Sequence, residues 1–336
     1  MVKFSNIPAI LKALILGLAL AAFSAAASAD PLNVAALLSQ GRVDDAISSL
    51  QNKISSSPKD AEAYNLLCRA YMQIENWDRG IAACQKAIAL DPGNSQYHLW
   101  LGRIYGQKAD HVGFLSAAGL AKKVRTEFET AVRLDPANLD ARSDLADFYL
   151  EAPGIVGGGQ DKAADQARQL ATADPREANL ILARIAEKSK DLGAAENHYR
   201  EAIKVSDGKP GAWLNLAQFY QRTGQLAKMQ DSLQHAVDAN NNTHVLMPAA
   251  KVLMHSQRDL PEAIELLRRY LARGTVEDDP AFKAHYLLGT MLEQQGDKTA
   301  AAQQYRDSLS LAKEFKPAQS ALERLNREIA DNVKPR

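Results

Sequence analysis

The sequence has little of several features that mark particular classes of protein. Its 336 residues include only two cysteines, which excludes a disulfide-stapled miniature scaffold and a four-cysteine zinc site. Aromatic residues make up 6% of the chain, a low share that favours closely packed helices over a β-sandwich. Neither charge dominates, because 40 lysines and arginines balance 40 aspartates and glutamates. Proteins that track nucleic-acid phosphates carry a basic stripe, so we expect no nucleic-acid partner.

Long apolar runs are also absent, apart from one near the start of the chain. Ala13–Ala27 is an uncharged run of about 15 residues, the length of a signal-peptide core and shorter than a membrane span. Ala27-Ser28-Ala29 fits a small-residue cleavage site. We therefore predict that residues 1–29 are a signal peptide and that the protein is periplasmic or secreted, with no membrane span after cleavage. An uncleaved N-terminal anchor is the alternative.

Motifs of catalysis and metal binding are missing as well. No two of the seven histidines stand four positions apart, which excludes a paired helical metal site. There is no Gly-x-Ser-x-Gly motif, and Cys68 lacks the partner residues that a cysteine nucleophile needs. We therefore expect no catalytic residue, no metal site and no cofactor. An exported enzyme ranks third among the function classes considered.

A repeated boundary signal divides the rest of the chain. It occurs as Leu90-Asp91-Pro92, Leu134-Asp135-Pro136 and Ala173-Asp174-Pro175, and Pro58 stands 34 residues before the first of these prolines. Proline ends a preceding helix or begins the next one, and an acidic residue beside it caps a helix. Successive boundaries are 34, 44 and 39 residues apart, which indicates a repeat of about 34 residues with two insertions.

Within each repeat the apolar residues follow helical spacing. In the second unit one helix face is formed by Tyr64, Leu67, Cys68 and Tyr71. A second helix of the same unit presents small residues at Gly80, Cys84 and Ala87. Small residues let two helices approach closely, and large residues fill the remaining space. Each repeat is therefore predicted to be a pair of packed helices.

The best-preserved units share one residue pattern. The third unit has Leu101-Gly102 and Tyr105, and the last has Leu288-Gly289 followed by Ala301 and Tyr305. This pattern resembles the tetratricopeptide repeat (TPR). The resemblance implies an all-α fold, a right-handed α-solenoid of about eight helix pairs over residues 30–315, with a capping helix and tail at 316–336. The pairs are predicted to begin near Pro31, Ala61, Ser95, Leu139, Arg176, Pro210, His244 and Phe282.

Solenoids of this family bind partners on a concave face that the first helix of each unit lines. The resemblance implies a non-enzymatic scaffold or adaptor of the cell envelope, which holds a peptide segment or a partner protein in this groove. The groove positions implied by the family's pattern are Asn65, Arg69, Gln73, Leu99, Arg103, Gln107, Ser143, Asp147, Leu150, Leu180, Arg184, Leu214, Gln218, Tyr286 and Glu293.

Two of these positions carry a sharper expectation. Arg69 and Arg103 take the same place in consecutive units, so we expect them to be neighbours that clamp one carboxylate or an acidic peptide segment. The alternative is that they are surface arginines paired with Glu62 or a similar acid. The family's carboxylate clamp for chaperone tails uses Lys and Asn at set positions. Because Asn65 takes the first of these positions and Arg69 the second, a cytosolic chaperone partner is not expected.

The two insertions fall in adjacent units. One adds about ten residues around Lys108–Ala118, and the other adds about five at Glu151–Gln160, where Pro153 and four glycines suggest a loop with exposed amides. We expect the insertions to protrude side by side and to form an accessory contact site with Phe114 and Ile155 as apolar anchors. A connection that packs on its own helices is the alternative. The second insert is also similar to one found in TPR-like periplasmic components of solute transporters, which gives the runner-up function.

The two cysteines lie in one unit, Cys68 on its first helix and Cys84 on its second. The two helices run antiparallel, and both positions are at a similar height from the turn between them. In an oxidising compartment they are able to form a disulfide. Two buried reduced thiols are the alternative, because sequence does not fix the separation of the Cα atoms.

Overall fold

The computed structural model describes residues 31–238, 243–256 and 259–333. Over these residues the regular secondary structure consists of seventeen α-helices and two 3-10 helices, without a strand. None of the described helices is both long and apolar enough to cross a membrane. The predicted signal peptide, its cleavage site and the alternative of an uncleaved anchor lie outside the described residues.

The helices follow one another in pairs. The first four pairs are α1 (Pro31–Ser39) and α2 (Val43–Ser56), α3 (Ala61–Gln73) and α4 (Trp77–Leu90), α5 (Ser95–Ala109) and α6 (Phe114–Leu134), and α7 (Leu139–Glu151) and α8 (Gln160–Leu170), with η1 (Gly154–Val156) inside the fourth. The next four are α9 (Pro175–Lys188) and α10 (Leu192–Val205), α11 (Pro210–Arg222) and α12 (Leu226–Asp238), α13 (Leu246–His255) and α14 (Leu260–Arg273), and α15 (Ala281–Gln294) and α16 (Lys298–Leu311). The short η2 (Thr243–Val245) leads into α13, and α17 (Lys316–Val333) follows the last pair.

The predicted all-α solenoid is confirmed, and the predicted pair boundaries lie within two residues of the observed helix starts. Local capping explains this agreement. Asp60 Oδ1 accepts the N–H of Ala63 at 2.8 Å at the start of α3. At the start of α9, Asp174 Oδ1 accepts the N–H of Glu177 at 2.9 Å, and Pro175 occupies the first turn. Both devices deal with the backbone N–H groups that a helix start leaves unpaired.

Small residues hold the two helices of a pair together, as the sequence pattern predicts. A Cβ atom on Gly102 would lie 2.4 Å from Cε1 of Phe128 on the partner helix, and one on Gly289 would lie 2.6 Å from Cε1 of Tyr305. The aromatic rings therefore rest directly on the glycine backbones. Two alanines of second helices, Ala87 of the second unit and Ala131 of the third, are likewise fully buried.

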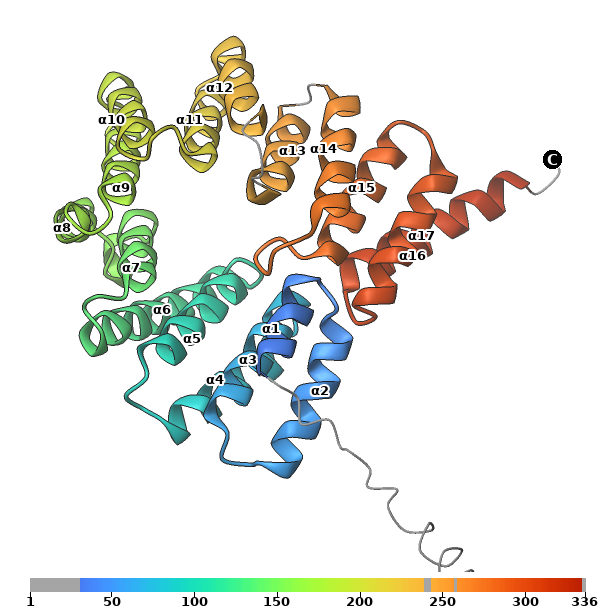
Figure 1. Cartoon of the computed structure of the whole chain (residues 1–336), viewed down its shortest axis with the longest axis horizontal. Helices are drawn as coiled ribbons and strands as arrows, with labels where there is room; N and C mark the ends of the chain where they lie inside the picture. Colours follow the sequence, from blue (N-terminus) through green and yellow to red (C-terminus); the bar gives the residue numbers. More distant parts are fainter. Residues whose placement is uncertain (1–30, 239–242, 257–258, 334–336) are drawn as a thin grey trace, which may run out of the picture.

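The row of pairs curves until its last units return to its first. Figure 1 shows α7, α9 and α11 on the inner side of the curve and α8, α10 and α12 on the outer side, with α15 and α16 beside α1 and α2. Phe282, Ala312 and Phe315 of the last units belong to the same buried apolar cluster as Val34 and Leu38 of α1. We call this meeting of first and last units the closure contact. The sequence did not predict it.

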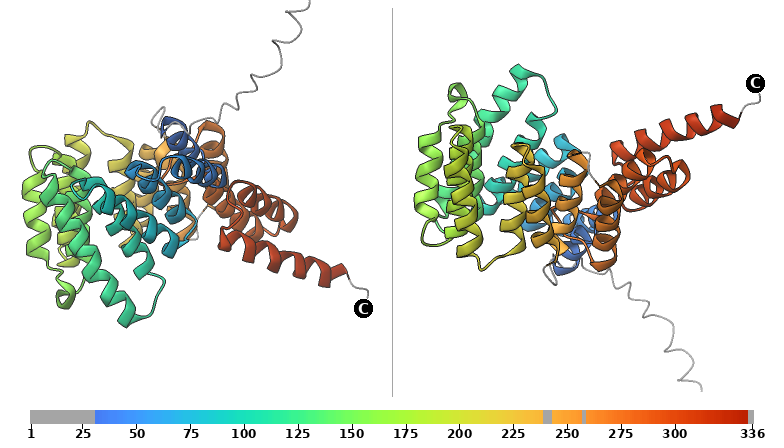
Figure 2. Two further views of the ribbon diagram at one scale, coloured as in Figure 1. Left: turned by 90° about the horizontal axis from the view of Figure 1, so that it is seen from below. Right: turned by 90° about the horizontal axis from the view of Figure 1, so that it is seen from above.

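The two insertions are built differently from one another. The first lengthens the helices of the third unit, because α6 has 21 residues where α4 has 14, and only residues 110–113 form the turn. Figure 2 shows the end of this α5–α6 hairpin projecting from the body of the molecule. The second insertion is a short connection that contains η1. The second insertion thus lies between the two helices of its unit, whereas the first was predicted as a connection and is largely part of the helices themselves.

Candidate functional site

Charged residues line the inner helices as a ladder of ion pairs between neighbouring units. Arg103 of α5 pairs with Asp144 of α7, with Nε and Oδ2 2.5 Å apart. Arg184 of α9 reaches back to Asp147 and Glu151 of α7. The pattern continues as Arg222 of α11 pairs with Glu187 of α9, with Nη2 and Oε1 2.8 Å apart.

Arg69 and Arg103 do lie close together, as expected from their places in consecutive units. The ring of Trp100 contacts both guanidinium groups, whose Cζ atoms are 4.6 and 4.7 Å from the ring centroid. Each arginine nevertheless has a carboxylate of its own. Arg69 binds Glu277 through two hydrogen bonds, whereas Arg103 binds Asp144, so no single carboxylate is clamped between them.

An open recess of about 480 Å³ lies along the ladder, between α5, α6, α7 and α9. Its lining includes the apolar residues Val124, Phe128 and Phe148 and the charged residues Arg103, Asp144, Asp147 and Arg184. A second recess of about 380 Å³ shares Glu151 and Arg184 with the first and continues to Glu187, Lys188 and Arg222. We call the two recesses together the α5–α11 groove.

Two carboxylates of this groove, those of Asp144 and Asp147, have a pKa above the ordinary value for aspartate. Burial raises the pKa of Asp147 to about 6, against the opposing attraction of Arg184. Burial also raises the pKa of Asp144, against the opposing hydrogen bond from Arg103. Desolvation therefore weighs against the ionised form at both positions. A partner that supplies hydrogen-bond donors here would stabilise the ionised form of these carboxylates.

The tips of the two insertions expose apolar side chains. Phe114 at the start of α6 is 81% exposed and Ile155 in η1 is 87% exposed. Leu115, which sequence reasoning missed, is 86% exposed. The sequence indicated this residue as a second large apolar side chain directly after Phe114.

The glycine loop does not present free amides, contrary to the expectation from its sequence. The N–H of Gly157 donates to Gly154 O at 2.9 Å, that of Gly158 to Pro153 O at 3.2 Å, and that of Gly159 to Tyr149 O at 2.7 Å. A Cβ on Gly158 would lie 1.8 Å from Ala152 O, so the close packing of this turn requires glycine there.

Cys68 of α3 and Cys84 of α4 are bonded to each other in the structure, with Cα atoms 5.2 Å apart. Both residues are fully buried in the second unit. The bridge therefore joins the two helices of one pair. Within the described residues, His, Cys, Asp and Glu side chains form no group of three or more that is able to hold a metal ion.

Comparison with known families agrees with this architecture. Three family models, each described as tetratricopeptide repeat, match residues 37–104, residues 177–208 and 210–243, and residues 256–317. These segments make up more than half of the chain. The chain belongs to the tetratricopeptide repeat family. The predicted resemblance is therefore confirmed.

The curated relatives are similar over a short stretch. The chain is 37% identical over 65 residues to cellulose synthase operon protein C of Escherichia coli strain K12, and equally to the putative cellulose synthase operon protein C of Escherichia coli O157:H7. The stretch is 19% of this chain and only 6% of each relative. The similarity therefore covers only a small part of each relative.

One of the solved structures that the chain resembles shows the same fold at low identity. Yeast Tom70 superposes with a TM-score of 0.54 and 17% identity, over 87% of this chain and 60% of that chain. A thermophilic TPR protein of Thermus thermophilus gives a TM-score of 0.47 and 19% identity, over 56% of this chain and 98% of that one. At these identities the likeness to Tom70 concerns the fold alone.

The TPR groove positions differ in their surroundings in the structure. Arg103, Asp147 and Arg184 line the open groove. The apolar positions Leu99, Leu150, Leu180 and Leu214 are buried among other apolar side chains. The polar Asn65 and Gln73 are buried as well. Ser143 Oγ donates to Glu177, and Tyr286 and Glu293 lie in the last pair, where Tyr286 contacts Phe315 and Glu293 binds Arg324. Gln107 is exposed and Gln218 is half-buried.

Sequence reasoning placed Asp147 in the groove but missed two other acidic residues of the ladder, Asp144 and Glu187. Asp144 and Glu187 are partners of arginines in the next or preceding TPR unit. Asp144 lies three residues before the predicted position Asp147, and Glu187 lies three residues after Arg184, one helical turn away in each case. An acidic residue one helical turn from a predicted groove position was the available signal.

Proposed function

We propose that this TPR protein is a non-enzymatic scaffold or adaptor of the cell envelope that holds a peptide segment of a partner protein in the α5–α11 groove. One observation carries the proposal. The groove is open over four consecutive units and combines an apolar floor at Val124 and Phe128 with charged walls. An extended peptide presents alternating apolar and polar groups that suit such a surface. The TPR fold generally serves protein–protein interaction.

The envelope location rests on the predicted signal peptide of residues 1–29. The matched curated relatives are named for a cellulose synthase operon, but the shared stretch is too short to bring that association to this chain.

Affinity capture tests the groove. The full chain is expressed, purified and used as bait in envelope extract, beside a variant with Arg103→Ala and Arg184→Ala. We expect a protein that binds the wild type and is lost from the groove variant, because both substitutions remove donors from the walls. Arg200→Ala is the matched control, since Arg200 pairs with Glu196 on the outer helix α10. Equal capture by all three proteins would place the binding surface outside the groove.

The runner-up function is an accessory component of a solute transporter. The recess of about 480 Å³ is within the size range of small-molecule sites, and its Arg103 and Arg184 side chains suit an anionic solute. A bound solute raises the thermal midpoint by mass action. A screen of small carboxylates and phosphates by thermal shift decides between the two functions. A solute that raises the thermal midpoint of the wild type, but not that of the variant with Arg103→Ala and Arg184→Ala, would favour the transporter function.

A further inference from the structure

The segment Gly274–Pro280, which joins α14 to α15, reaches across the curve to the first units. Figure 1 shows this connection extending toward α3 and α5. Arg69 Nε donates to Glu277 Oε1 at 2.7 Å, and Gln73 Nε2 donates to the backbone carbonyl of Glu277 at 3.0 Å. Thr275 Oγ1 donates to Ser39 O at 2.6 Å. Direct hydrogen bonds thus join groups that are more than 200 residues apart in the chain.

This segment fills the inner surface at α3. Only about 50 Å³ of space remains between Trp100, Gln107, Asp278 and Lys283, whereas the neighbouring recess holds about 480 Å³. Two polar side chains of α3 are almost fully covered, because Asn65 is 2% exposed and Gln73 is 5% exposed. The oxygens Asn65 Oδ1 and Gln73 Oε1 have no hydrogen-bond partner there. Leaving a buried acceptor unpaired is unfavourable, so the covered arrangement carries a cost of its own.

The shape of the segment is fixed by its own half of the molecule. The hydroxyl of Tyr270 on α14 accepts the N–H of Val276 at 2.9 Å and donates to Asp279 O. Lys251 of α13 binds Asp279, with Nζ and Oδ1 2.7 Å apart. These contacts hold the residues on both sides of Glu277, and so fix the backbone that carries its carboxylate. The segment therefore does not need Arg69 in order to be ordered.

We propose that Gly274–Pro280 is a latch, which closes over the α3 surface through Glu277 and is released to uncover Arg69 and Gln73. The latch shortens the α5–α11 groove at one end, so a partner that extends to α3 must displace it. That consequence rests on the proposed function, whereas the latch itself does not. Release would give Gln73 Oε1 access to donors from water or from a partner.

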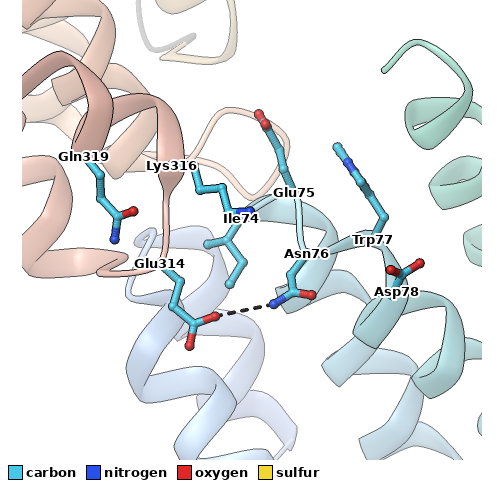
Figure 3. Close-up of a pocket in the computed structure, with 8 residues that line it drawn as sticks. All are labelled: Ile74, Glu75, Asn76, Trp77, Asp78, Glu314, Lys316 and Gln319. Atoms are coloured by element: carbon cyan, nitrogen blue, oxygen red, sulfur yellow. Dashed lines mark hydrogen bonds between the residues drawn. The ribbon is translucent and has the colours of Figure 1, made fainter. Parts of the chain in front are cut away.

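The rest of the closure contact does not depend on the latch. Phe282 and Phe315 share an apolar cluster with α1, and Asp44 Oδ2 accepts the N–H of Lys313 at 3.0 Å. Nearby, Asn76 and Glu314 face each other across a polar cleft of about 330 Å³ and are joined by one long hydrogen bond of 3.4 Å (Figure 3). The latch is thus able to leave α3 while the first and last units stay together.

Trp100 reports the state of the latch, because it lies beside both Arg69 and the acidic segment. The experiment uses the full chain with Trp77→Phe and Trp213→Phe, which leaves Trp100 as its one tryptophan. Acrylamide quenching then measures access to this ring, without any partner present. We expect Glu277→Arg to raise the quenching constant, because the new charge repels Arg69. Glu277→Gln should raise it less.

Glu187→Gln is the matched control, since it removes the carboxylate of another inter-unit pair that lies away from Trp100. It should leave the quenching constant at the wild-type value. Circular dichroism checks that each variant keeps its helices. A helical Glu277→Arg protein that is quenched like the wild type would overturn the proposal. If Glu277→Arg loses its helices, Glu277→Gln decides, and an unchanged quenching constant in that variant would also overturn it. Because no partner is present, this outcome is independent of the capture experiment.

Discussion

At the scale of single residues, the inner surface is governed by the balance between burial and charge pairing. Arg103, Arg184 and Arg222 each meet a carboxylate from a neighbouring unit. Such pairs contribute little net stability at an exposed site, because their attraction is offset by lost hydration and lost side-chain freedom. Their effect is to hold neighbouring units in register and to prevent unpaired charge from lining the groove.

Asp147 gives a prediction about pH. Its pKa is raised to about 6 from an ordinary value near 3.8, chiefly by burial. The folded state therefore binds a proton that the unfolded state releases between these pH values, so the contribution of Asp147 to stability falls as pH rises from about 4 to about 6. Because the side chain is nearly half exposed, the change should be below about 1 kcal/mol.

Denaturant unfolding at pH 4, 5, 6 and 7 measures this contribution. Asp147→Asn should remove it, so the difference in stability between variant and wild type should change across that pH range. A carbon-13 titration of the Asp147 carboxyl checks the pKa directly. A midpoint near the ordinary value would contradict the prediction.

At the scale of helices and turns, the pairs α5–α6 and α15–α16 are held by a glycine on one helix and an aromatic ring on the other. This pattern is local, and it let the sequence predict the helix pairs and their starts from Asp-Pro boundaries and from Leu-Gly positions. The lengthened α5–α6 hairpin was predicted as an insertion, but not as added helix. Helical and loop insertions of equal length differ only in weak local preferences, which neighbouring packing overrides.

The disulfide belongs to this scale, because it joins α3 to α4. It spans 16 residues, and a loop of this size is stabilised by about 3 kcal/mol when it is closed. We expect a reductant to lower the thermal midpoint of the wild type and to leave the Cys68→Ala, Cys84→Ala variant unchanged. Alkylation of native protein without reductant, followed by mass spectrometry, checks the oxidation state. Two labelled cysteines would contradict the bridge.

The insertion tips give a second prediction at this scale. Phe114, Leu115 and Ile155 are exposed and fill no part of the core. Replacing all three with serine should therefore leave the thermal midpoint within about 1 °C, since surface substitutions change stability little. If the tips form the accessory contact site, the triple variant should capture less of the partner in the affinity experiment. Unchanged capture would favour the alternative, in which the insertions pack on their own helices and contact no partner.

At the scale of the whole molecule, the main departure from the sequence prediction is the closure contact. It depends on the summed rotation between successive units, and no single residue pattern encodes that sum. The partners of Arg69 and Gln73 were unpredictable for the same reason. Glu277 is more than 200 residues away in the chain, and only the curvature of the intervening units brings it to α3.

Two glycines test the closure contact in solution. Gly41 and Gly224 have nearly the same left-handed backbone, with φ of 70° and 72°, and each ends the first helix of its unit. A Cβ on Gly224 meets nothing within 4 Å, whereas one on Gly41 would lie 2.5 Å from the N atom of Ala281 in α15. Gly224→Ala should cost about 1 kcal/mol from backbone strain alone. Gly41→Ala should cost about 1–3 kcal/mol more, because it also crowds α15.

Denaturant unfolding of both variants measures the difference. A similar loss of stability in the two proteins would indicate that the first and last units are apart in solution. The comparison is internal, since the conformational penalty of a side chain at positive φ is common to both.

The closure contact also changes how the array should unfold. In an open row of repeats, the end units have one neighbour each, and they fray before the middle does. Here α1 and α2 pack on α3 at one side and share an apolar cluster with Phe282 and Phe315 at the other. The first unit thus has support from both directions. Loss of either terminal unit removes a contact from the opposite end of the chain, which couples the two ends into one cooperative unit.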